Sequence, residues 1–423
     1  MDSITALYRA CAPDEALKGG DERWVDCDEA RGSHVVTLLA RALRRADPAR
    51  PEFKLFTGHR GIGKSTELFR LKHLLENPHR NESRYCVIYM DATQHLDIAD
   101  LDSPDLAVMM ASQVQDQLQQ QKIPGFSPVT VLFEQVWDAF RATLKSEPNV
   151  QKLDVSAGLL KLTTEIKGSP TARQKLRQAI ELQTTTLRQA TNDLLRTAAQ
   201  ALQAANLGGL VLIVDGLDKL PTDRHERIFC DRCDQLVNYQ ASIVYAVPIS
   251  LAYGPRFAET RQTFGEDCVP VPMLRMEEPA TGLTTMEEMI RKRCQAAGVD
   301  PEHVFDSPQT RQYLCRQTGG HTRHLFAFLQ ATLNRVDAFP VRQTDVEAAI
   351  RDYSDSLARE IPAECWKWLR MFRSGRLDRL PAELPDPLRR SMLHWLYIFE
   401  YRNGEPYYNV NPVIRNLSNF TPS

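Results

Sequence analysis

Residues 58–65 have the types and spacing of a loop that binds phosphate groups. The segment reads Gly58-His59-Arg60-Gly61-Ile62-Gly63-Lys64-Ser65, and Thr66 follows it. Its glycines let successive backbone N–H groups turn toward an anion, and the helix that begins near Lys64 offers its positive end to the same anion. In such a loop the lysine neutralises phosphates and the following hydroxyl ligates Mg²⁺. The sequence therefore predicts a nucleotide site at residues 58–66, with a nucleoside triphosphate and Mg²⁺ as its ligands.

The residues on either side predict the strand and the helix that this loop needs. The largely apolar segment 53–57 leads into the loop, and Leu68, Leu71 and Leu75 recur after it at helical spacing. The loop is therefore expected to join a buried strand to an amphipathic helix.

A second acidic position follows another apolar run. Five apolar residues, 210–214, precede Asp215 without alternation, which suits a central parallel strand covered on both faces. Asp215 then lies at the carboxyl edge of the sheet, beside the phosphate loop. We expect Asp215 to hold Mg²⁺ together with Ser65, and Asp218 to orient the attacking water.

These motifs resemble those of AAA+ and STAND-type P-loop ATPases, and the match covers most of the chain. The stretch Asp215-Gly216-Leu217-Asp218 looks like the STAND form of the acid-ending strand, where a further acid commonly follows. Lys219 occupies that position instead, which argues against fast hydrolysis. A lysine after this aspartate is also similar to the pattern of KAP-type NTPases. The resemblance implies an α/β fold: a P-loop NTPase parallel sheet core, an all-helical lid and a C-terminal winged-helix domain. It also implies slow ATP hydrolysis.

The resemblance further implies a sensor arginine. Gly319-Gly320-His321-Thr322 breaks the chain before a segment with helical spacing, and Arg323 stands at the start of that segment. This is similar to the sensor 2 motif of AAA+ lids, in which an arginine reaches back to the γ-phosphate.

Other positions of the family pattern stay open. The strand predicted at 241–248 carries Ala246 where a polar sensor 1 is usual, and Ser250 beyond it is either a sensor or a loop serine. Arg256 and Arg261 are either fingers for a neighbouring subunit or surface arginines. Trp24 either packs on the adenine or anchors the core.

The chain of 423 residues divides into three predicted regions. We assign 1–275 to the ATPase core, 276–358 to the helical lid and 359–423 to the winged-helix-like domain. The segment from about 126 to 207 is longer than one crossover needs and reads as an insertion. Residues 153–162 indicate a hairpin in it. Near-heptad apolar spacing indicates one long helix buried on the core, through Leu176, Ile180, Leu187, Leu194 and Ala201. An exposed apolar stripe there would instead be a docking or oligomer surface.

Composition favours a cytoplasmic protein that does not contact membranes. No run approaches ~18 apolar residues, and Met1-Asp2-Ser3 does not begin a signal region. With 52 basic and 54 acidic residues the net charge is −2, so no overall field attracts nucleic acid. Nine scattered cysteines fit reduced thiols. Cys230 and Cys233 have the spacing of a metal pair but no second pair, so we expect no zinc.

The use of the C-terminal domain separates the possible functions. Arginines that could contact DNA phosphates, Arg389, Arg390, Arg402 and Arg415, are offset by Asp386, Glu400 and Glu405. We therefore favour a slowly hydrolysing ATP switch that controls homo-oligomerisation or a separate effector protein, in bacterial (antiphage) defence or signalling. One alternative is an AAA+ regulator or loader that binds nucleic acid through the winged helix. Another is a non-hydrolysing scaffold with ATP as a structural ligand.

Overall fold

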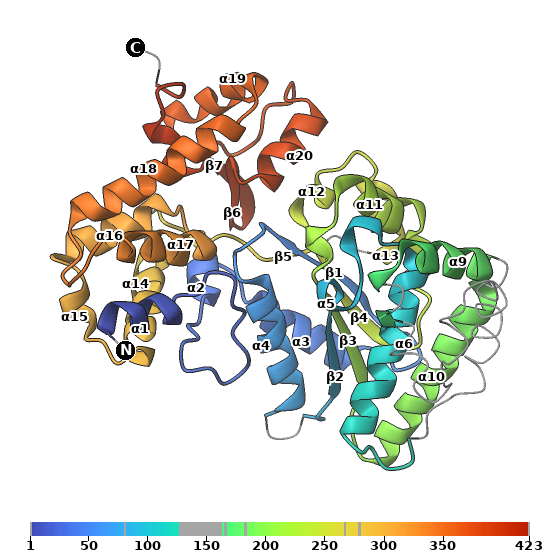
Figure 1. Cartoon of the computed structure of the whole chain (residues 1–423). Helices are drawn as coiled ribbons and strands as arrows, with labels where there is room; N and C mark the ends of the chain where they lie inside the picture. The colour runs from blue at the N-terminus through green and yellow to red at the C-terminus, as the bar shows by residue number, and fades with distance from the viewer. Residues whose placement is uncertain are drawn as a thin grey trace.

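A parallel sheet lies at the centre of the part of the molecule that precedes the lid. The computed structural model describes residues 2–79, 82–126, 163–164, 167–181, 184–265, 268–277 and 281–421. Figure 1 shows a sheet flanked by helices, a group of helices beside it, and a C-terminal group that touches both. The strands of the sheet are β1 (Phe53–Gly58), β2 (Cys86–Asp91), β3 (Leu210–Asp215), β4 (Ser242–Pro248) and β5 (Val269–Pro270).

The order of these strands is β2-β3-β4-β1-β5, and every pair is parallel. Gly58 pairs with Pro248 and Asp91 pairs with Asp215, so the phosphate loop and Asp215 leave the sheet at the same edge. All six residues of β3 are buried, as their unbroken apolar run predicts. The predicted parallel α/β core is confirmed.

Helices cover both faces of the sheet. On one face lie α3 (Val35–Arg45) and α4 (Lys64–Glu76), and Leu68, Leu71 and Leu75 are fully buried there, as predicted. On the other face lie α6 (Ser103–Gln120) and α10 (Thr184–Ala204). Short helices at the strand ends are α2 (Asp28–Arg31), α5 (Ala92–His95), α11 (Thr222–Glu226), α12 (Ile249–Ala252) and α13 (Phe257–Phe264).

The insertion differs from its prediction. The single long helix expected there is wrong, because the structure has two, α9 (Pro170–Glu181) and α10, which point in different directions in Figure 1. Helix α10 begins at three consecutive threonines, 184–186, and β-branched residues favour a helix end over a helix interior. Burial on the core is confirmed, because Leu187 and Leu194 belong to the core beneath α6. The hairpin predicted at 153–162 lies outside the described residues.

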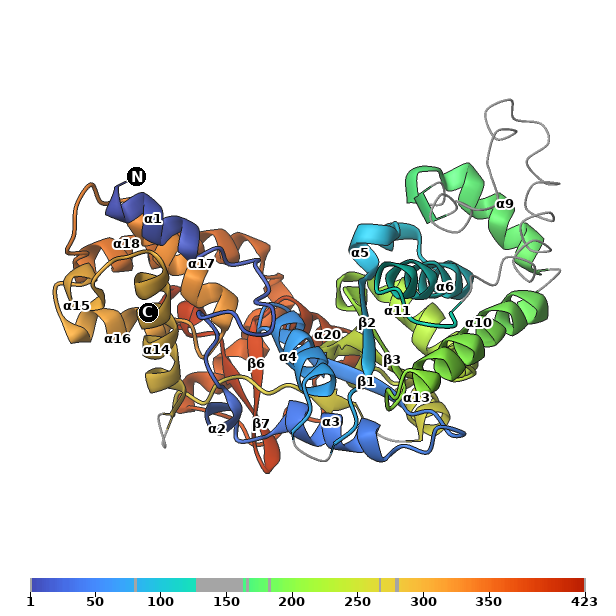
Figure 2. The ribbon, with the colours of Figure 1, turned by 90° about the horizontal axis from the view of Figure 1, so that it is seen from below.

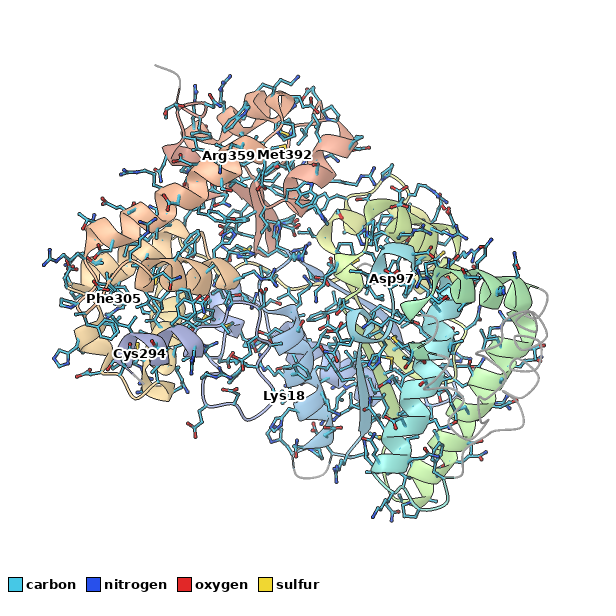
Figure 3. The ribbon with its side chains drawn as sticks, viewed as in Figure 1. Lys18, Asp97, Cys294, Phe305, Arg359 and Met392 are labelled. Atoms are coloured by element: carbon cyan, nitrogen blue, oxygen red, sulfur yellow. The ribbon has the colours of Figure 1, made fainter. Side chains whose placement is uncertain are left out.

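The regular elements of the described lid are helices, apart from a single parallel bridge between Phe305 and Val341. The lid contains α14 (Thr281–Ala296), α15 (Pro301–Val304), α16 (Pro308–Gln317), α17 (Thr322–Leu333) and α18 (Gln343–Glu360). Cys294 and Phe305, which Figure 3 labels, are buried in this group. The first helix, α1 (Ser3–Ala10), packs on α14 and α17. The domain boundary at 275 stays a prediction.

The C-terminal module, which we define as residues 363–416, has the order helix, helix and hairpin, which is consistent with the expected winged helix. A helical stretch around α19 (Trp366–Leu369) is followed by α20 (Asp386–His394), and β6 (Ile398–Asn403) pairs antiparallel with β7 (Glu405–Val410). Leu377 adds a bridge to Tyr408, and Gly404 turns the hairpin with φ of 77°. Figure 2 shows β6 and β7 between the lid and the helices on the sheet.

The C-terminal module shares its cores with the rest of the molecule. Phe399, Tyr401 and Tyr407 of the hairpin join the core of the sheet face beneath α3 and α4. Met392 of α20, labelled in Figure 3, joins the core of the lid. The module is therefore packed against both neighbours. No helix in the described ranges combines the length and the apolar character that crossing a membrane requires.

Candidate nucleotide site

The phosphate loop has the backbone shape that its glycines predict. Gly58, Gly61 and Gly63 adopt φ of 154°, 88° and 91°, which L side chains rarely allow. Lys64 is 4% exposed, and its Nζ donates to the carbonyls of Gly58 (3.0 Å) and His59 (2.9 Å). The ammonium is thus held back over the loop, and α4 begins at Lys64 itself. The loop and the helix N-terminus together form an anion site.

Asp218 faces this lysine. Its Oδ2 lies 2.8 Å from the Nζ of Lys64, and both side chains are buried. Burial acts to raise the pKa of Asp218, but the opposite charge and hydrogen bond of Lys64 outweigh it and hold that pKa below its ordinary value. Asp218 is therefore an anionic carboxylate next to the loop, where an acid that orients water has to lie. Lys219 also lines the pocket.

Asp215 and Ser65 provide the oxygen atoms that Mg²⁺ prefers. Asp215 accepts from the N–H of Gly216 at Oδ1 (2.7 Å) and from the hydroxyl of Tyr89 at Oδ2 (2.6 Å). The hydroxyl of Ser65 lies near Asp215, and burial first and the charge of Asp218 second raise the pKa of Asp215. A hydroxyl and a carboxylate that meet beside a phosphate loop fit a magnesium-bound nucleotide.

The start of α17 rests on the phosphate loop. The N–H of Arg323 (3.0 Å) and the hydroxyl of Thr322 (2.9 Å) both donate to the carbonyl of Gly61, and Nε2 of His321 donates to the carbonyl of Arg60 (2.7 Å). A Cβ added to Gly61 would lie 2.8 Å from His321, so this close approach requires glycine. The lid and the loop are thus joined by direct hydrogen bonds.

Arg323 lines the same pocket as Lys64, as the sequence predicts. Its Nε lies 2.9 Å from a carboxylate oxygen of Asp14, whose side chain is 81% exposed. An ion pair this exposed contributes little to stability, so the guanidinium is available to a phosphate. Its sensor role stays a prediction.

Apolar and aromatic side chains also line the pocket. Trp24 and Leu17 from the N-terminal segment and Met289 and Phe326 from the lid line it. Arg293 lies over the ring of Phe326, with its guanidinium carbon 4.4 Å from the ring centroid. Such a lining suits a nucleobase, and it includes the Trp24 that the sequence left open between adenine contact and core anchor.

His59 connects the phosphate loop to the C-terminal module. The sequence assigns it to the phosphate cradle, but its side chain, 1% exposed, lies between α20 and β6. Nδ1 donates to the carbonyl of Leu393 (3.2 Å), and Nε2 accepts the N–H of Glu400 (2.7 Å). Burial lowers the pKa of His59 to about 3, so the ring is neutral at pH 7 and these two bonds fix its tautomer.

Further contacts hold the module in the same place. His321 stacks on Phe399 with centroids 5.8 Å apart, and the hydroxyl of Tyr401 donates to the carbonyl of Gly319 (2.5 Å). On the other side, Arg390 of α20 pairs with Glu226 of α11 at 2.5 Å. The module therefore touches the loop, the lid and the helix after β3 at once.

The other residues singled out from the family pattern lie away from the nucleotide pocket. Ser250 lies in α12 beside a small pocket with His225 and Arg390, none of which lines the nucleotide pocket. Arg256 pairs with Asp231 and Glu259, and Arg261 lines a separate groove near Tyr408. Within the described ranges no group of three or more His, Cys, Asp or Glu could hold a metal, and Cys230 and Cys233 are free thiols.

Three residues at the site were not found from the sequence. Buried Arg31 donates to the carbonyls of Ile62 (2.8 Å) and Pro272 (2.5 Å), Tyr89 binds Asp215, and Phe326 lines the pocket. Each acts across a long stretch of chain, so no local spacing marks it.

No family model and no curated protein matches this sequence. Among solved structures, it is similar to Cdc6p from Pyrobaculum aerophilum, with 12% identity and a TM-score of 0.41, covering 98% of this chain and 96% of that one. It is also similar to a Walker-type ATPase of Pyrococcus abyssi (14% identity, TM-score 0.47, 96% and 98% covered). A third similar structure is that of the Aeropyrum pernix Orc1 protein in complex with DNA, with 14% identity and a TM-score of 0.38, covering 97% of this chain and 96% of that one. At these TM-scores the likenesses carry no argument about function, which rests on the site.

Proposed function

We propose that this chain is an AAA+-type P-loop ATPase that acts as a nucleotide-controlled switch. It binds ATP with Mg²⁺, hydrolyses it slowly, and couples the occupancy of its phosphate loop to the position of its C-terminal module. The observation that carries the proposal is His59, a residue of the phosphate loop whose side chain is bonded to α20 and β6. A change in the loop is thereby transmitted directly to the module.

The roles at the site follow from the geometry. Lys64 and the loop N–H groups bind the β- and γ-phosphates, while Ser65 and Asp215 hold the cation. Arg323 contacts the γ-phosphate from the lid. Asp218 orients water, but it is paired with Lys64 at 2.8 Å, and it turns to water only when Lys64 engages a phosphate. This competition, together with Lys219 in place of an acid, supports slow turnover.

The output of the switch is assembly or a partner protein. Release of the module uncovers the surfaces of α20 and β6 that now face the loop and α11. Those surfaces are then free to bind a second copy of this chain or a separate effector, as in defence and signalling switches.

Recognition of DNA by α20 agrees less well with the structure, in which the C-terminal module is docked on the loop and the lid. Arg390 is engaged with Glu226, and Arg389 pairs with Asp386 (3.2 Å) and donates to the carbonyl of Leu384 (3.3 Å). A helix that reads DNA needs such arginines directed at phosphates or bases. Salt-sensitive duplex binding by the nucleotide-free protein would therefore favour the DNA alternative.

The test is the mass of the protein in solution, by light scattering after size exclusion, with ADP, ATP or a slowly hydrolysed ATP analogue. We expect the triphosphates to change the assembly state or the hydrodynamic radius of the wild type but not of Lys64→Ala. Identical behaviour in every nucleotide would contradict the switch. ATP left intact after long incubation would instead support the scaffold alternative, whereas turnover that Asp215→Ala abolishes would exclude it.

A further inference from the structure

The hydroxyl of Tyr89 binds the carboxylate of the candidate magnesium site. Tyr89 lies on β2, opposite Ile213 of β3, and its hydroxyl donates to Oδ2 of Asp215 at 2.6 Å. The hydroxyl of Ser65 lies near both groups. One phenol thus holds the carboxylate at the end of β3, beside the loop hydroxyl.

The ring of Tyr89 is fixed from the other side. It stacks on Phe69 of α4, with centroids 4.2 Å apart and planes at 26°. A phenol is protonated at neutral pH, so the hydroxyl of Tyr89 acts as a hydrogen-bond donor to Asp215. The stack aims this donor at a single acceptor.

A count of hydrogen bonds shows what the donor does for Asp215. An ionised carboxylate has about four acceptor positions. The N–H of Gly216 and the phenol of Tyr89 occupy two of them, one on each oxygen. The other positions are free for the water molecules of a cation, while these two bonds fix the orientation of the carboxylate.

We propose that Tyr89 is a positioning residue that holds Asp215, beside Ser65, in the geometry that binds Mg²⁺, and that it sets the Mg²⁺ affinity of the nucleotide site. The inference rests on the proposed nucleotide site. Partners that orient the ligands of a metal change its affinity by about 10- to 100-fold when they are removed. A residue needed only for packing changes nucleotide binding with and without the cation alike.

The experiment compares Tyr89→Phe with wild type, both as the full chain. This substitution keeps the ring and its stack on Phe69 and removes only the hydroxyl. The matched control is Tyr85→Phe, because the hydroxyl of Tyr85 donates at 3.4 Å to the carbonyl of Arg44, which does not line the nucleotide pocket. Binding of a fluorescent ATP analogue is followed while Mg²⁺ is titrated, and again in EDTA.

We expect Tyr89→Phe to need about tenfold more Mg²⁺ for half-maximal binding, with unchanged nucleotide affinity in EDTA. Tyr85→Phe is expected to follow the wild type in both measurements. A wild-type Mg²⁺ requirement in Tyr89→Phe would overturn the inference, and so would equal losses with and without Mg²⁺. Failure of the wild type to bind nucleotide at all would refute the proposed function itself, so the two failures are distinguishable.

Discussion

The imidazole of His59 and the backbone N–H of Glu400 form a 2.7 Å hydrogen bond that joins the phosphate loop to the first strand of the C-terminal hairpin. The same ring holds the carbonyl of Leu393, at the end of the preceding helix. Both bonds are buried, so neither group finds water as a replacement while the module stays docked. The loop and the module therefore move together or separate together.

Removal of the imidazole should loosen the module. His59→Ala leaves the N–H of Glu400 and the carbonyl of Leu393 unsatisfied, at a cost of about 1–3 kcal/mol for each group. We expect a lower melting temperature and faster proteolysis after residue 360. His303→Ala, which changes a histidine side chain that is 81% exposed, is the control and should behave as wild type. Unchanged protease resistance in His59→Ala would contradict the role of this contact.

Acidification should also loosen the C-terminal module. Burial lowers the pKa of His59 and of His324 to about 3 and that of His321 well below its ordinary 6.5, and Lys64 near His59 and Arg323 near the other two act in the same direction. All three histidines are neutral in the folded protein with the module docked, and they titrate near pH 6.5 once they are exposed to water. The contribution of each to the free energy of unfolding is therefore complete above pH 6.5. It falls by about 1.4 kcal/mol per pH unit as the pH drops toward 3.

The measurement for this prediction is the free energy of unfolding by denaturant at pH 7.5, 6.5 and 5.5. We expect it to be level between the first two values and to fall between the last two, with a smaller fall in His59→Gln. Equal stability at pH 6.5 and 5.5 would show that these histidines do not gain protons on release.

Nucleotide binding should depend on Lys64. Hydrogen bonds to charged groups contribute about 1.5–3 kcal/mol, so Lys64→Ala should weaken ATP binding by about 10- to 100-fold or more. Calorimetric titration with ATP and Mg²⁺ measures this loss. Lys72→Ala on the same helix is the control, because its ammonium pairs with Glu76 at 2.6 Å, away from the loop. Wild-type affinity in Lys64→Ala would mean that nucleotide binds elsewhere.

Arg323 should distinguish ATP from ADP. Its backbone N–H already binds Gly61, and substitution leaves that bond intact. We therefore expect Arg323→Ala to reduce ATP hydrolysis and ATP affinity while ADP affinity stays near wild type, because the guanidinium acts on the γ-phosphate. Arg316→Ala, on the neighbouring helix α16, serves as control. Equal losses for ATP and ADP would refute a sensor role.

Local sequence patterns predicted the parts of the site that lie within one strand–loop–helix unit. The loop glycines, the buried leucines of α4 and the position of Asp215 at the sheet edge all follow from neighbours a few residues apart. The order of helices and hairpin in the C-terminal module was predictable for the same reason.

The contacts between distant segments were not predictable from the sequence. His59 fits the variable position of a phosphate loop, and nothing near it in sequence indicates a partner more than 330 residues away. Tyr89 likewise has the residue type of any buried strand position. Such contacts depend on how three packed regions meet, which periodicity does not encode.

The central claim is that nucleotide in the phosphate loop controls docking of the C-terminal module. Hydrogen exchange of the amide of Glu400, followed by mass spectrometry of the peptide that contains β6, reports on the bond to His59 directly. We predict slow exchange in the nucleotide-free protein and in Lys64→Ala under all conditions, and faster exchange in the wild type with a slowly hydrolysed ATP analogue and Mg²⁺. The same exchange rate in all these states, with nucleotide demonstrably bound to the wild type, would contradict the account.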